Sequence, residues 1–108
     1  MASEKDYKAI IAGIGAYTAE LRRAVPAAMQ GFGALAKGGS APGAVDAKTK
    51  EPVALAIGVT QHCDGCIGYH AKALVELGAS RDEVAEILGT CVYMGGGPAL
   101  MYAAETIA

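Results

Sequence analysis

The chain has 108 residues, a length that predicts a single domain over residues 1–108. Hydrophobic residues make up 53% of it and charged residues only 19%. Its net charge of −2 and lack of a Lys/Arg cluster argue against nucleic-acid binding, and no uninterrupted apolar run reaches the ~20 residues of a membrane span. Because the first residues also lack the apolar segment of a signal peptide, we expect a cytoplasmic protein, whose apolar content favours contacts with further subunits.

Two helices are predicted in the N-terminal third of the chain. Over residues 7–23, apolar side chains recur at helical spacing and charged side chains occupy the other face. Residues 26–37 form a weaker helical pattern, which Pro26 opens. The glycine-rich stretch that follows interrupts the pattern. We therefore expect residues 1–37 to form an N-terminal helical pair and residues 44–108 to form the core.

A third helix is predicted over residues 46–61. It is apolar on most of its sides, so we expect it to be central and buried. If Asp46 caps it, Pro52 lies past the first turn and should kink the helix. If Thr49 caps it, Pro52 lies in the first turn and costs little. The sequence leaves both alternatives open, and in either case Glu51 lies in the early turns.

Three further helices complete the prediction. The fourth begins near the cysteines and ends before Gly78, a residue type favoured just after a helix. The fifth begins at Ser80, where Glu83 completes a capping box. The run Gly95–Gly97 then breaks the chain, and Pro98 opens the last helix. Since no alternating strand pattern of useful length is present, we predict an all-α protein.

The run from Cys63 to His70 carries the predicted chemistry. On a helix, Cys63, Cys66 and His70 share one face, because they recur at i, i+3 and i+7. A thiolate is the nucleophile of thiol redox chemistry, and a neighbouring imidazole can take its proton. The helix N-terminus favours Cys63 as the attacking sulfur, whereas proximity to His70 favours Cys66. These arguments leave the choice open, and the two sulfurs are close enough to form a disulfide.

Other polar residues near the motif receive plainer interpretations. Asp64 is expected to satisfy backbone donors at the start of the helix. His62 is interpreted as a polar residue at a helix end. Cys91, in an apolar context, is expected to be a buried small hydrophobe. Among the tyrosines, Tyr69 beside His70 is the one candidate for a role in the site.

The stretch from Glu51 to His70 resembles the core of the carboxymuconolactone decarboxylase superfamily, and more closely its alkyl hydroperoxidase D (AhpD-like) branch. The shared pattern is a Glu twelve residues before a C-x-x-C motif and a His four residues beyond the second Cys. The resemblance continues into the glycine-rich turn and covers about half of the chain. It implies an AhpD-like bundle of about six helices, with the C-x-x-C at the N-terminus of a central helix. It also implies assembly into a homo-oligomer, a hexamer or a trimer.

The resemblance implies a thiol-dependent peroxidase that needs no cofactor. In AhpD-like enzymes the second Cys is peroxidatic, which makes Cys66 the attacking thiolate and Cys63 the resolving one. Glu51 and His70 match a proton relay that activates the thiol. The implied partners are a peroxide substrate and a dithiol reductant, either lipoyl-bearing or thioredoxin-like. One departure is Gly65, where the longest-studied AhpD-type members carry a His, so the relay is expected to be shorter here.

Other classes of function compete with this interpretation. A metal could take Cys63, Cys66, His70 and perhaps Glu51 as ligands, although their spacing departs from that of zinc fingers. A c-type haem is excluded because Ile67, not a His, follows Cys66. A disulfide oxidoreductase or a redox-sensing assembly protein would use the cysteines without peroxide chemistry. Glu51→Gln separates a sensor from a peroxidase, because only the peroxidase needs the relay.

Overall fold

The computed structural model describes residues 5–107, which form five α-helices. These are α1 (Tyr7–Ala24), α2 (Pro26–Ser40), α3 (Ala47–Thr60), α4 (Asp64–Glu76) and α5 (Arg81–Ile107). No strand occurs in this range, which confirms the all-α prediction. The predicted break at Gly95–Gly97 is confirmed at Gly96, where φ of 74° and ψ of −158° are not helical. The helical parts on its two sides are counted together as α5, which makes five helices rather than about six.

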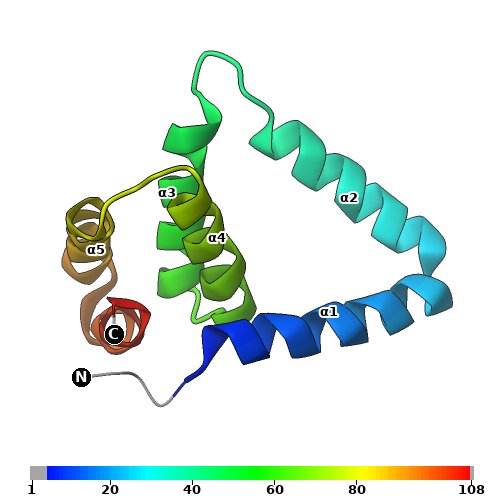
Figure 1. Ribbon diagram of the computed structural model, residues 1–108, viewed down its shortest axis with the longest axis horizontal. Helices are drawn as coiled ribbons and strands as arrows, with labels where there is room; N and C mark the ends of the chain where they lie inside the picture. Colours follow the sequence, from blue (N-terminus) through cyan, green and yellow to red (C-terminus); the bar gives the residue numbers. More distant parts are fainter. Residues whose placement is uncertain (1–4, 108) are drawn as a thin grey trace.

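Helices α3, α4 and α5 form the packed part of the molecule, and α1 and α2 form an arm beside it (Figure 1). Helix α3 packs against both α4 and α5, and α1 packs against α4. Helix α2 lies apart from α4 and joins the rest of the chain at its two ends (Figure 1). No residue of α1 or α2 is buried. The buried cluster therefore comes from α3, α4 and α5: Leu55, Val59, Ile67, Leu74, Leu88, Cys91 and Ala103.

Helix α1 approaches α4 closely across two glycines. A Cβ added at Gly68 would overlap the side chain of Ile11, and one at Gly65 would lie 2.7 Å from Cδ1 of Ile14. The hydroxyl of Tyr69 also donates to the carbonyl oxygen of Ile11, at 3.2 Å. The absence of side chains at these glycines therefore lets α1 lie directly on the helix that begins at the cysteines.

The start of α3 decides between the two capping alternatives. Asp46 is the cap, because its carboxylate accepts the backbone N–H of Thr49 at 2.7 Å. Pro52 consequently lies inside α3, and the helix continues through it. The prediction that α3 is central and buried is confirmed for its place between α4 and α5, but its burial is only partial. Val53 and Ile57 are more than half exposed, although α3 packs against both α4 and α5.

The turn between α4 and α5, residues 74–83, is here called the serine joint. Gly78 has a φ of 82°, and the backbone closes a Schellman turn onto the carbonyls of Leu74 and Val75. Ser80 Oγ then accepts the N–H of Glu83 at 3.1 Å, and Glu83 Oε1 accepts the N–H of Ser80 at 3.0 Å. The predicted helix stop and capping box are both confirmed.

Helix α5 has the length and composition of a membrane-spanning helix, as no other helix in residues 5–107 has. The interruption at Gly96 divides it, so that neither part reaches the ~20 residues of a span. Its first part supplies Leu88 and Cys91 to the core. Cys91 is 2% exposed, which confirms the prediction of a buried small hydrophobe, and burial raises the pKa of its thiol.

Candidate active site

The two cysteines lie at the turn between α3 and α4, residues 58–66, here called the cysteine joint. The N–H of Cys63 donates to the carbonyl of Gly58 at 2.9 Å, and that of His62 donates to the carbonyl of Val59 at 3.2 Å. This is again the hydrogen-bond pattern of a Schellman turn. His62 therefore takes the left-handed position, with a φ of 59°, that glycine usually occupies. The next residue, Cys63, is the N-cap of α4.

Cys63 and Cys66 form a disulfide across the first turn of α4. Their Cα atoms are 5.2 Å apart, within the usual range for bonded cysteines. Cys63 Sγ also accepts the N–H of Cys66 at 3.1 Å, so the sulfur performs the capping that an oxygen usually performs. The capping role predicted for Asp64 is therefore wrong. Its carboxylate pairs instead with Nζ of Lys5, at 2.9 Å.

Glu51 of α3 and His70 of α4 meet where the two helices pack together. Nδ1 of His70 lies 2.7 Å from Oε2 of Glu51, and the two side chains are 36% and 20% exposed. His70 follows Cys66 by one helical turn on the same face of α4. Because the carboxylate engages Nδ1, proton exchange with a thiol or a substrate falls to Nε2. The imidazole of His70 thus connects the carboxylate of Glu51 on α3 to the face of α4 that carries the cysteines.

Gly58 allows α3 to approach α4 at the second cysteine. A Cβ added at Gly58 would lie 2.9 Å from Cβ of Cys66 and 3.6 Å from the backbone of Cys66 and Ile67. A side chain there would therefore force the two helices apart at the redox pair. Sequence reasoning missed Gly58 as a site residue. The signal that could have found it is a glycine inside an otherwise apolar helical pattern.

His62 also has a larger role than that of a polar residue at a helix end. Its ring stacks on that of Tyr102 in α5, with centroids 4.6 Å apart and planes inclined by 11°. Nζ of Lys5 lies 4.5 Å from the centroid of the same Tyr102 ring and pairs with Glu105 as well. These contacts join the cysteine joint to the end of the chain, about 40 residues away, which no local pattern reveals.

The candidate Tyr69 and the departure at Gly65 both lie where α1 covers α4. Tyr69 is 44% exposed, and its hydroxyl is engaged by the carbonyl of Ile11. Ile14 fills the space beside Gly65. A histidine at position 65, as in the longest-studied AhpD-type members, would have to displace that isoleucine. The packing of α1 therefore gives a physical reason for the glycine in this chain.

The disulfide-bonded cysteines do not line either of two cavities in the molecule. The larger, of about 690 Å³, lies between α1 and α4, and the other, of about 440 Å³, lies among α3, α4 and α5. Neither is lined by Cys63, Cys66, His70 or Glu51. Within residues 5–107, no group of three or more His, Cys, Asp or Glu side chains is placed so that it could hold a metal ion.

Comparisons with known proteins show the family of this chain. The sequence profile of the carboxymuconolactone decarboxylase family matches residues 26–108. The chain belongs to the carboxymuconolactone decarboxylase family. An uncharacterized protein from Cupriavidus necator is 35% identical over 103 residues, which are 95% of this chain and 91% of the relative. An uncharacterized protein of the cox locus of Paracoccus denitrificans is 32% identical over 89 residues, 82% of this chain and 80% of the relative.

A solved structure of the family has the same fold. It is the crystal structure of an apo carboxymuconolactone decarboxylase family protein from Legionella pneumophila, which is 48% identical to this chain with a TM-score of 0.89. The match covers 94% of this chain and 90% of that chain. These findings confirm membership in the superfamily that residues 51–70 indicated.

Proposed function

We propose that this family member is a thiol-dependent peroxidase of the AhpD-like type, with Cys63 and Cys66 as its redox pair. The observation that carries the proposal is the Glu51–His70 hydrogen bond, one helical turn from Cys66. A disulfide used only for structure needs no base, whereas a thiol that must lose its proton before attack does. The spacing of the four residues is also that of the AhpD-like branch.

In the reduced enzyme, Cys66 is the attacking sulfur and His70 accepts its proton. The thiolate attacks one oxygen of the hydroperoxide, the O–O bond breaks, and Cys66 becomes a sulfenic acid. The leaving alkoxide takes the proton from His70 and departs as an alcohol. Glu51 stabilises the imidazolium while it holds that proton. Cys63 then attacks the sulfenic sulfur, the disulfide forms, and the oxygen leaves as water.

A dithiol donor completes the cycle. Two successive thiol–disulfide exchanges return Cys63 and Cys66 to thiols and leave the donor as a disulfide, so no cofactor takes part. Both cysteines are partly exposed at the joint, outside the two cavities. This position suits a donor carried on another protein, and the resemblance indicates a lipoyl group or a thioredoxin-like protein.

Consumption of an organic hydroperoxide by the reduced protein, with dihydrolipoamide as donor, tests the proposal. We expect turnover that Cys66→Ser abolishes and that Glu51→Gln lowers by about a hundredfold, the usual scale of general-base catalysis. Glu86→Gln is the matched control, since Glu86 is an exposed carboxylate of α5. Turnover that survives both site substitutions contradicts the mechanism. A reversible disulfide without turnover would assign the pair to a disulfide oxidoreductase or a redox sensor instead.

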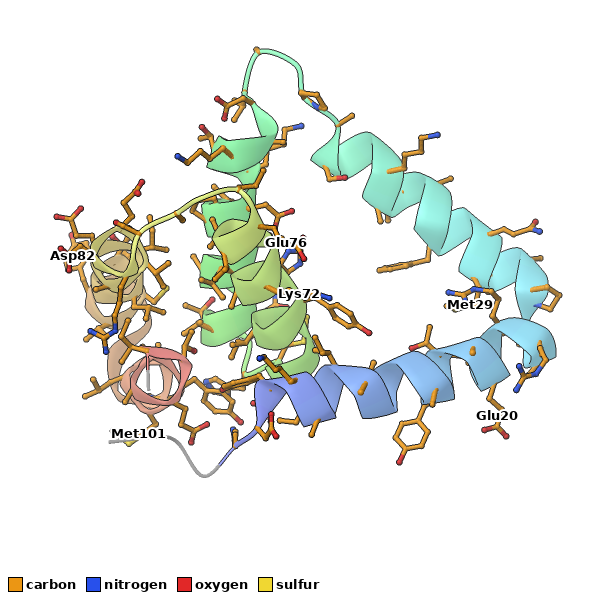
Figure 2. All side chains as sticks on the ribbon, in the orientation of Figure 1. Glu20, Met29, Lys72, Glu76, Asp82 and Met101 are labelled. Atoms are coloured by element: carbon orange, nitrogen blue, oxygen red, sulfur yellow. A yellow bond between two sulfur atoms is a disulfide. The ribbon has the colours of Figure 1, made fainter. Side chains whose placement is uncertain are left out.

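We further propose that a second copy of this chain covers the arm formed by α1 and α2. Phe32 and Leu35 of α2 are 64% and 69% exposed. Figure 2 shows Glu20 and Met29 at the end of the arm farthest from α5. An isolated helix of the length of α2 is marginal in water, so its apolar side chains need a partner surface. The AhpD resemblance indicates a hexamer or a trimer.

Sedimentation equilibrium tests this assembly. We expect a mass several times that of the 10.9 kDa chain. Replacing Phe32 and Leu35 together by Asp should reduce it to a smaller species, because charged side chains are excluded from an apolar interface. Gln30→Asp adds a charge to the same helix at a position that is already polar, and should leave the mass unchanged. A wild-type protein with the mass of one chain would contradict the proposal.

A further inference from the structure

Lys5 connects three parts of the molecule at the cysteine joint. Its ammonium pairs with Asp64 at 2.9 Å, pairs with Glu105 of α5, and lies 4.5 Å from the centroid of the Tyr102 ring. The side chains of Lys5 and Asp64 are 28% and 36% exposed, so solvent screens the pair only in part. Figure 1 shows the start of α1 beside the end of α5, as these contacts require.

Asp64 lies inside the C-x-x-C motif, between the two sulfurs in sequence. A carboxylate on the residue next to Cys63 disfavours a thiolate there, because two negative charges repel each other. Lys5 supplies one positive charge, which Asp64 shares with Glu105. Its hydrogen bonds to Glu105 and Asp64 raise the pKa of Lys5 above its ordinary value of 10.5. The ammonium therefore stays charged through the neutral pH range and is lost only in strong alkali.

The same contacts hold the backbone on both sides of Cys63. His62, before it, stacks on Tyr102, and Asp64, after it, pairs with Lys5, which lies over the same ring. The first cysteine is thus fixed between two neighbours that α5 anchors. The titratable groups around the joint come from the segment before α1, from α1, from the joint and from α5: Lys5, Tyr7, His62, Asp64, Tyr102 and Glu105. The Glu51–His70 pair lies one turn further along α4.

We propose that Lys5 is a positioning residue for the redox pair, which offsets part of the negative charge of Asp64 and Glu105 and holds the cysteine joint against α5, and so raises the thiolate fraction of the reduced cysteines. The inference rests on the proposed redox role of Cys63 and Cys66. It assigns a function to residues outside the Cys, Glu and His pattern. It also gives the start of α1 and the end of α5, which contribute no catalytic residue, a part in the chemistry.

Alkylation of the reduced protein by iodoacetamide tests the proposal, because alkylation follows the thiolate and needs no peroxide. The modified cysteine is identified by mass spectrometry as a function of pH. Lys5→Met should slow alkylation of the redox pair at pH 7 by about threefold to tenfold and move the pH profile to higher pH, since an unpaired carboxylate acts on the thiols. Lys5→Arg should retain the wild-type rate. Lys8→Met removes a nearby exposed lysine of α1 and should change nothing.

Asp64→Asn shows whether Lys5 acts on the thiols through its charge or only through packing. Added to Lys5→Met it should restore the wild-type rate, and alone it should leave the rate at or above that of the wild type. A purely structural role for Lys5 predicts no such restoration, and that result would overturn the proposal. An unchanged rate in Lys5→Met would overturn it as well. Since no step of this assay uses peroxide, failure of the peroxidase proposal would be seen separately, in the turnover assay.

Discussion

The cysteine joint and the serine joint follow the same backbone plan with different residues. Each ends one helix in a Schellman turn and begins the next with a side-chain cap. In the serine joint, Gly78 takes the left-handed position and Ser80 is the cap. In the cysteine joint, His62 and Cys63 take those two places. The serine joint thus uses the residue types that capping favours, and the cysteine joint uses residues with chemistry of their own.

The correspondence extends to the third position of each new helix. Glu83 stands there in α5 and closes a capping box with Ser80. Cys66 stands there in α4. Its N–H still donates to Cys63 Sγ, and the disulfide takes the place of the second, returning hydrogen bond of a capping box. The C-x-x-C motif therefore occupies the frame of a capping box. This frame brings the sulfurs to a helix N-terminus, where backbone donors stabilise a thiolate.

The two joints also differ in what they require of the preceding helix, and this difference gives the largest expected effect. Gly58 and Leu74 occupy equivalent positions, but only at Gly58 does the backbone approach a cysteine. We expect Gly58→Ala to lower the free energy of unfolding by about 2 kcal/mol through overpacking, and to slow the peroxide reaction. Urea denaturation measures the first effect. Gly89→Ala is the control, because a Cβ there meets nothing within 4 Å and should stabilise α5 by about 0.5–1 kcal/mol.

Substitutions of Gly78 and His62, the two residues with a left-handed backbone at the joints, should have the next largest effects on stability. Gly78→Ala should cost about 1–2 kcal/mol, because an alanine has no compensating contact at a φ of 82°. His62→Ala should cost about 1 kcal/mol, since it keeps the strain and loses the stacking on Tyr102. His62→Gly loses the same stacking but removes the strain, so its stability should stay close to that of the wild type. Equal unfolding midpoints for the two His62 variants would show that position 62 is not strained.

The capping residues should give a smaller effect. Ser80→Ala removes a cap and should cost about 1 kcal/mol. Cys63→Ser keeps a capping atom, so the reduced variant should unfold within about 0.5 kcal/mol of the reduced wild type, although it can no longer form the disulfide. Urea midpoints in the presence of a reductant compare the two. If reduced Cys63→Ser were as unstable as Ser80→Ala, Cys63 would have no replaceable capping role.

The smallest expected difference between the two joints is in how stability falls at acidic pH. Hydrogen bonds from Ser80 lower the pKa of Glu83 below its ordinary value of 4.5. The stabilisation is therefore present above about pH 4.5 and is lost as pH falls through the lowered pKa. The cysteine joint has no carboxylate in its cap. We expect Glu83→Gln to flatten the fall of the urea midpoint between pH 5 and pH 3, whereas an unchanged slope would exclude this contribution.

The serine joint could be predicted in full from the sequence, because its signals are local. Gly78 follows an apolar helical pattern, and Ser80 stands three residues before Glu83. At the cysteine joint, helical spacing indicates the two cysteines and His70, and the resemblance to the AhpD-like branch adds Glu51. The sequence also predicts the bounds of α1 to within one residue, from helical periodicity, and the start of α2, from Pro26.

The rest of the cysteine joint depends on distant contacts. A histidine in the left-handed region has no sequence signature, and the stacking of His62 on Tyr102 depends on how α5 folds back. The pairing of Asp64 with Lys5 spans 59 positions. The exposure of Val53 was mispredicted because an apolar pattern does not say how many neighbours the chain supplies. Tertiary packing decides each of these, and local propensity does not.

The most direct test of the account is the single-turnover reaction of the reduced protein with an organic hydroperoxide. Samples are quenched with iodoacetamide and the remaining thiols are counted by mass spectrometry. The account predicts oxidation of Cys66 followed by disulfide formation with Cys63, a stable sulfenic acid on Cys66 in Cys63→Ser, and a rate at pH 7 that Glu51→Gln lowers at least tenfold. Oxidation that begins at Cys63, or a rate that Glu51→Gln leaves unchanged, would contradict it.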